Sequence, residues 1–178
     1  MDIKEFHSKN IYFAEDYFRN HNELPTTVFV ATEQNVLVLH APFENDKQKA
    51  QVFDFYALIL KISKAKYYTF ASESWMYITD KLPTVKPSQH PDRKTVLTFL
   101  TIDRNKNIIP SLFEVQRNLL IPFDCNEYSQ IESEATELFD RDDFDKAIID
   151  RIDTLWNIKK PMWVTEVDYS EYDVKVDS

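Results

Sequence analysis

The residues that could do chemistry gather in one stretch of the chain, residues 67–104. Glu73, His90, Asp92 and Arg93 lie there, between two expected strands. Loops held by rigid elements are where binding and catalysis concentrate, and a histidine can act as acid or base near neutral pH. If these four side chains line a pocket, they suit a small hydrolase or phosphodiesterase.

A structural role for the same residues competes with the catalytic one. Glu73 and Arg93 stand at the two ends of a long, proline-containing connection, and a guanidinium–carboxylate ion pair could close it like a clasp. Trp75 would then anchor the base of the loop or dock onto another protein. We expect the clasp first, and keep the pocket and the docking loop as alternatives.

Other kinds of site lack their motifs. The chain has no glycine, which excludes the glycine-rich loops that cradle phosphates. The four histidines have no short spacing suited to zinc. Asp80 with Asp92-Arg93-Lys94 has the letters of a nuclease motif, but in an expected loop rather than a strand. Cys125 sits beside acidic residues that disfavour its thiolate. We therefore expect no metal and no cofactor.

Charge and composition restrict the partners. Residues 123–178 hold 16 of the 30 acidic and 6 of the 21 basic side chains, so the net charge of −9 sits entirely in the last third. No basic stripe is present to neutralise phosphates, so we expect no direct nucleic-acid binding. One cysteine, no signal peptide and no apolar run of membrane-spanning length indicate a cytoplasmic protein that does not enter a membrane.

The hydrophobic periodicity predicts an α+β fold in the order α-ββ-α-β-ββ-α. Turn positions that favour left-handed backbone must fall to residues other than glycine, and we expect asparagines such as Asn35. The sheet would be single, mainly antiparallel and five-stranded, with helices packed on it. The expected elements are helices 3–21 and 45–64, strands 27–31, 36–40, 67–71, 95–103 and 107–116, and a final helix between Asp142 and Pro161.

The end of the chain differs from the rest. Apolar and acidic residues alternate after Pro161, which is typical of an extended arm or an edge strand. We expect one α+β domain over residues 1–160 and an acidic, aromatic arm over 161–178. Aromatic residues flanked by carboxylates often anchor interfaces; here these are Trp156, Trp163, Tyr169 and Tyr172.

Two resemblances add to this interpretation. The order of elements resembles the longin, roadblock and profilin-like group of α+β sandwiches. Ser72-Glu73-Ser74-Trp75-Met76, followed by Pro91-Asp92-Arg93 before the next strand, resembles a family of uncharacterised small phage and bacterial proteins with Ser-Glu-Ala-Trp-Met and Pro-Asp-Arg at these places. That resemblance implies no known activity, and marks Glu73, Trp75, Asp92 and Arg93 as characteristic positions.

Together these features favour a non-enzymatic accessory protein of a phage or mobile element. It would act in the cytoplasm, or in the host cytoplasm if a phage encodes it, by protein–protein interaction through its acidic C-terminal face. The partner would be another protein or a second copy of the chain. The first alternative is the small hydrolase or phosphodiesterase using Glu73, His90, Asp92 and Arg93. The second is an inhibitor of a host defence or nucleic-acid enzyme that mimics phosphates with its carboxylates.

Overall fold

A single antiparallel sheet of seven strands organises the described part of the chain, in the spatial order β6-β5-β4-β3-β1-β2-β7. The computed structural model describes residues 1–41, 43–76, 85–117, 119–124, 134–142, 144, 150 and 164–169. The strands are β1 (Thr27–Ala31), β2 (Val36–His40), β3 (Tyr67–Met76), β4 (Lys94–Asp103), β5 (Ile108–Gln116), β6 (Leu119–Phe123) and β7 (Val164–Val167).

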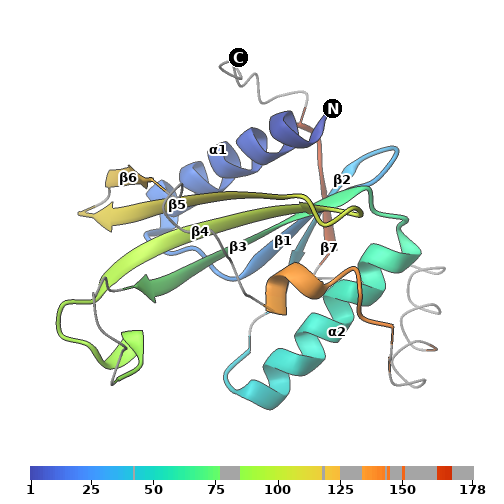
Figure 1. Ribbon diagram of the computed structural model, residues 1–178. Coiled ribbons are helices and arrows are strands. Elements are labelled where there is room, and N and C mark those ends of the chain that lie inside the picture. Colours follow the sequence, from blue (N-terminus) through green and yellow to red (C-terminus); the bar gives the residue numbers. More distant parts are fainter. Residues whose placement is uncertain are drawn as a thin grey trace.

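Two α-helices cover opposite faces of this sheet, α1 (Ile3–His21) and α2 (Asp46–Ile62) (Figure 1). Short 3₁₀-helices, η1 (Pro87–Gln89) and η2 (Glu134–Glu137), lie in the connections. Each face therefore has its own core. Phe53, Tyr56 and Phe70 are buried on the α2 side, whereas Phe6, Phe29 and Phe99 are buried on the α1 side.

The helices predicted at 3–21 and 45–64 are confirmed as α1 and α2, and local chemistry explains their starts. The Asp2 carboxylate accepts the Glu5 backbone N–H at 2.9 Å ahead of α1, and the Asn45 side chain accepts that of Gln48 at 3.0 Å ahead of α2. Such caps satisfy amides that have no partner inside the helix. Asn22 ends α1 in a left-handed conformation, with φ of 58°.

The left-handed positions only partly follow expectation. In the described residues, positive φ angles occur at Asn22, Lys64, Lys106 and Arg117, and Asn35 is not among them. The prediction for Asn35 is wrong because a different device closes the β1–β2 turn. The Thr32 hydroxyl donates to the Asn35 carbonyl at 2.9 Å and accepts the Asn35 N–H at 3.0 Å.

The predicted five-stranded sheet and its order are also wrong. The five expected strands are present, but β3 runs on to Met76, and β6 and β7 extend the sheet at its two edges. β6 follows β5 almost directly and contains Pro122, which obscured it. β7 takes residues 164–167 of the predicted arm into the sheet as the neighbour of β2. The longin-like, five-stranded topology is therefore not the topology of this chain. The predicted helix between Asp142 and Pro161 falls almost wholly outside the described residues.

A chain of polar side chains crosses the interface between α1 and the sheet. His7 Nδ1 lies 2.7 Å from Thr101 Oγ1, and His7 Nε2 lies 2.8 Å from Ser111 Oγ. The Thr101 hydroxyl is 2.6 Å from that of Thr69, which accepts from the Asn10 side-chain amide. All these groups are satisfied when Thr101 donates to a neutral His7 ring that carries its proton on Nε2. α1 is thus docked by directional bonds as well as by apolar contact.

The buried His7 makes stability depend on pH. Burial lowers the pKa of His7 from 6.5 to about 4, so between these values the unfolded chain binds a proton that the folded chain excludes. The stabilisation is complete above the unfolded pKa and is lost as pH falls, at about 1.4 kcal/mol per pH unit. Urea unfolding should show a free energy of unfolding roughly 2 kcal/mol lower at about pH 5 than at about pH 7.5.

The matched control for this effect is His7→Gln, which keeps a hydrogen-bonding side chain but cannot titrate. We expect the variant to be less stable at neutral pH and to lose most of this pH dependence. Equal pH dependence in the two proteins would contradict the assignment to His7.

Candidate functional site

β3 is paired on both sides for only half of its length. It pairs with β4 over ten residues, Tyr67 to Met76, but with β1 over five, Tyr67 to Ala71. Among the described residues, the segment Ser72–Met76 therefore has a strand neighbour on the β4 side alone, and the connection before β1 reaches it at Leu24, whose N–H contacts the Glu73 side chain. Figure 1 shows this end of the β3–β4 pair pointing away from α2. We call Ser72–Met76 the free edge of β3.

Burial changes sharply at the same point. Residues Tyr68 to Ala71 are buried, whereas Glu73, Ser74 and Trp75 are exposed one after another. The Trp75 side chain is 52% exposed. Since successive side chains of a strand alternate between faces, this run shows that neither face of the free edge is covered by a helix.

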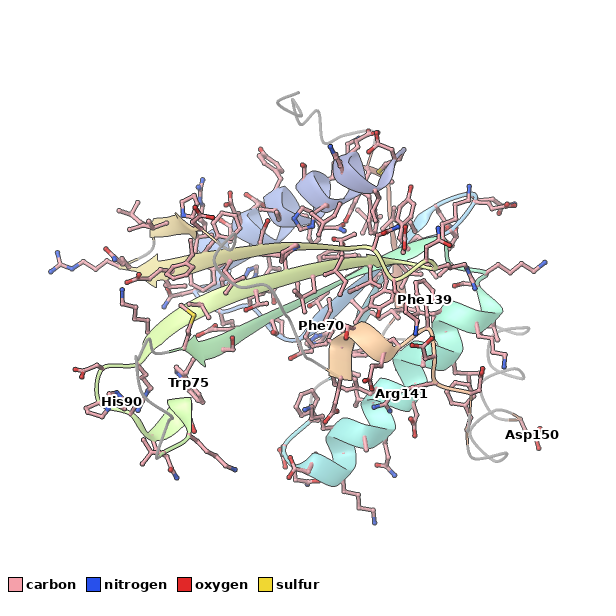
Figure 2. All side chains as sticks on the ribbon, in the orientation of Figure 1. Phe70, Trp75, His90, Phe139, Arg141 and Asp150 are labelled. Carbon is pink, nitrogen blue, oxygen red and sulfur yellow. The ribbon has the colours of Figure 1, made fainter. Side chains whose placement is uncertain are left out.

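Arg93 holds the exposed indole in place. Its guanidinium carbon lies 5.5 Å from the centroid of the Trp75 ring, and its Nη1 donates to the Ser88 carbonyl at 2.9 Å. A cation over an aromatic face at an exposed site is worth about 0.5–1 kcal/mol. Figure 2 shows Trp75 and His90 at the same end of the sheet. The tryptophan and the arginine form one preorganised cluster, the Trp75–Arg93 cluster.

His90 and Asp92 build the turn that presents Arg93. The Asp92 backbone N–H donates to His90 Nδ1 at 3.2 Å, and the Arg93 N–H donates to the His90 carbonyl at 3.2 Å. The Asp92 carboxylate lies 4.0 Å from His90 Nδ1 and is 89% exposed. These contacts are local, and they orient the backbone that enters β4.

The base of the cluster is rigid on its other side. Lys94, the first residue of β4, donates to the Glu114 carboxylate of β5 at 2.8 Å. This hydrogen bond lowers the pKa of Glu114. The first residue of β4 is therefore bound to β5 by a side-chain contact.

The expected ion pair between Glu73 and Arg93 does not form. Glu73 pairs in register with Leu97, and Arg93 lies four residues before Leu97, a distance of about 13 Å along the strand. The Glu73 carboxylate instead accepts the Leu24 backbone N–H at 3.4 Å. The clasp is wrong because β3 continues through Glu73, where the sequence suggested a loop.

The four residues of the predicted catalytic pocket do not converge on one point. Glu73 faces Leu24, the Arg93 guanidinium lies on Trp75, and Asp92 points into solvent beside His90. Cavities in the described part of the chain lie elsewhere. A polar cavity of about 670 Å³ is lined by Glu5, Lys66 and Asp168, and an apolar groove of about 240 Å³ by Phe13, Tyr17 and Val38.

The predicted interaction aromatics are only partly described. Trp156, Trp163 and Tyr172 lie outside the described residues. Tyr169 is 5% exposed. Its hydroxyl donates to the Asn10 side-chain oxygen, and its carbonyl accepts from Lys9 at 3.1 Å. Tyr169 thus closes the polar chain under α1, where it packs on its own domain.

The acidic segment around η2 is bound to the rest of the chain. Arg141 contacts the Asp54 carboxylate of α2 at 2.6 Å. Asp140 pairs with Lys106 at 2.8 Å, and Asp142 lies 3.6 Å from Lys61. Asp140 and Asp142 of this segment are therefore matched by lysines of the body, which weakens the case for an unbalanced acidic surface here.

Searches for other kinds of site add little. No group of three or more His, Cys, Asp or Glu side chains suited to a metal ion is found among the described residues. Of the helices that the structure describes, none is long and apolar enough to cross a membrane. Comparisons with protein-family models, curated proteins and solved structures found no match.

The sequence picked out Trp75 and Arg93 but missed their contact with each other and the free edge beside them. A signal was present. The expected strand 95–103 is nine residues long, whereas its partner was expected to end at Ala71. If the strand predicted at 67–71 had been given the length of its partner, it would have included Ser72–Met76. The lack of a second strand neighbour for this segment would then have been evident.

Tyr169→Phe tests whether the C-terminal aromatic is structural. The change removes the hydroxyl that donates to Asn10 and leaves a buried acceptor unsatisfied, which costs about 1–3 kcal/mol. Urea unfolding should report this loss, and Tyr12→Phe at an exposed position of α1 should show almost none. Equal stability of the two variants would contradict the buried role of Tyr169.

Proposed function

We propose that this protein acts by binding another protein through the Trp75–Arg93 cluster. The observation that carries the proposal is a half-exposed tryptophan held under an arginine at the free end of a rigid strand pair. Tryptophan and arginine dominate the energetics of protein interfaces. Burial of the indole in a partner's pocket would release ordered water.

The surroundings of the cluster suit an interface. Glu73, Ser74 and Asp92, which neighbour Trp75 and Arg93 along the chain, are exposed and polar, as are the rim residues of many interfaces. The contact with Arg93 already restricts the indole, so little side-chain entropy remains to be lost on binding. The partner should offer an apolar pocket with a carboxylate beside it, which would meet the exposed part of the guanidinium.

The resemblance of this segment to small phage and bacterial proteins places the proposal in context. Trp75 and Arg93 are two of the four positions that the resemblance marks. We propose that they mark a binding surface of an accessory protein. The hydrolase alternative gains no support from side chains that point apart. The phosphate-mimic alternative gains none from Asp140 and Asp142 near η2, which are paired with Lys106 and Lys61.

Trp75→Ala should abolish binding and leave the fold intact. Residue 75 is exposed and lies beyond the cores, so the free energy of unfolding should change by less than about 1 kcal/mol. Affinity for the partner should fall by about thirtyfold or more, as expected for an interface anchor. Photo-crosslinking from position 75 in cells that express the chain would first identify the partner, and calorimetry with the purified partner would give the affinities.

Tyr12→Ala is the matched control, because Tyr12 is an aromatic residue of equal exposure, 53%, on α1. It should bind as the unmodified protein does. The proposal fails if Trp75→Ala and Tyr12→Ala retain the partner equally well.

A further inference from the structure

We infer that the partner is a second copy of this chain, joined by antiparallel pairing of the two free β3 edges. The inference rests on the proposed function and gives its partner an identity. A strand edge with unpaired backbone groups is a template for another strand. In the free edge, the N–H and C=O of every second residue point away from β4. They point to the side of β3 on which β1 pairs with Tyr67–Ala71 but not with Ser72–Met76.

This edge is better suited to pairing than the described outer edge at β6. β6 carries Pro122, whose nitrogen has no hydrogen to donate, and proline on an edge strand discourages further pairing. Ser72–Met76 has no proline and no lysine. Of these two edges, β6 carries a proline that discourages further pairing, and Ser72–Met76 carries none.

A two-fold axis through Ser74 gives the pairing its register. Ser74 then lies opposite Ser74 of the second copy, and Glu73 lies opposite Trp75 of the second copy. Directly opposed residues share a face of the sheet. Glu73 and Trp75 follow Ala71 in alternation, so both lie on the face that α1 covers further along β3.

Charge complementarity supports this register over others. The Arg93 guanidinium lies on the Trp75 ring, so it is carried toward Glu73 of the second copy. Glu73 and Arg93 are too far apart along the strands to pair within one chain, but two copies bring them together twice across the axis. Five paired residues and one tryptophan per copy make a small interface, so we expect a reversible dimer with a dissociation constant on the order of micromolar.

Disulfide trapping tests the register. Opposed Cα atoms in an antiparallel pair lie about 4.5–5.5 Å apart, within the range of a disulfide. Ser74→Cys, in a Cys125→Ser background, should form a covalent dimer under mild oxidation. Ser72→Cys in the same background is the matched control and should not, because Ser72 faces Met76 of the second copy.

Charge reversal tests the cross-axis pair. Glu73→Arg and Arg93→Glu should each be monomeric by light scattering at concentrations where the unmodified chain dimerises, with affinity lowered about tenfold or more. An equimolar mixture of the two variants should form a heterodimer, because both cross-axis contacts are then attractive. A contact within one chain could not be restored by mixing.

Circular dichroism and urea unfolding show whether each variant is folded. A dimer that Trp75→Ala disrupts, with trapping at position 74 and rescue by mixing, establishes the inference. A chain that stays monomeric at about 100 times the expected dissociation constant overturns it, as does a dimer that is trapped equally at positions 72 and 74. A monomer whose Trp75-dependent partner is a different protein overturns the second copy and leaves the proposed function standing.

Discussion

The unequal pairing of β3 is the constraint on which the rest of this structure depends. Where β3 has neighbours on both sides, its side chains enter both cores, and Tyr68, Thr69, Phe70 and Ala71 are all buried. Beyond Ala71, where the pairing with β1 ends, the same strand is exposed to solvent on both faces and has no described strand along one edge. One continuous strand therefore carries the centre of the fold and the candidate interaction site, and β4, which pairs with β5, runs beside both.

Both faces of the sheet carry an apolar core, and the α1 face adds a network of directional bonds. On the α2 side the core is formed by aromatic and aliphatic side chains, whose packing is not directional. On the α1 side, bonds among His7, Asn10, Thr69, Thr101 and Tyr169 fix the position of the helix. Such a buried network is worth much only when every member is satisfied. Tyr169 completes it from far along the chain, so the segment after β7 contributes to the seating of the first helix.

Sequence reasoning succeeded where local chemistry decides the outcome. Both α-helices were predicted because the periodic stripe of apolar residues that marks each of them acts within a few residues. It failed at β3, because alternation between polar and apolar residues marks a strand only when one face is buried. Ser72-Glu73-Ser74 has no buried face. It is a strand because it pairs with β4, and its own residue types do not indicate that pairing. The polar core was missed for a similar reason, since a lone His7 on a helix gives no sign of partners at Thr101 and Ser111.

The opposite charges of Glu73 and Arg93 predicted an ion pair within one chain, and the strand geometry prevents it. Their complementarity suggested a clasp because the intervening residues looked like a loop, which can bring its ends together. A strand cannot do so, because its rise of about 3.3 Å per residue holds residues apart as firmly as it aligns them. The same rigidity places Glu73 beside Trp75 on one face and Arg93 over that tryptophan. In the two-fold pairing that we infer, Glu73 of one copy would approach the Trp75–Arg93 cluster of the other without any further residue.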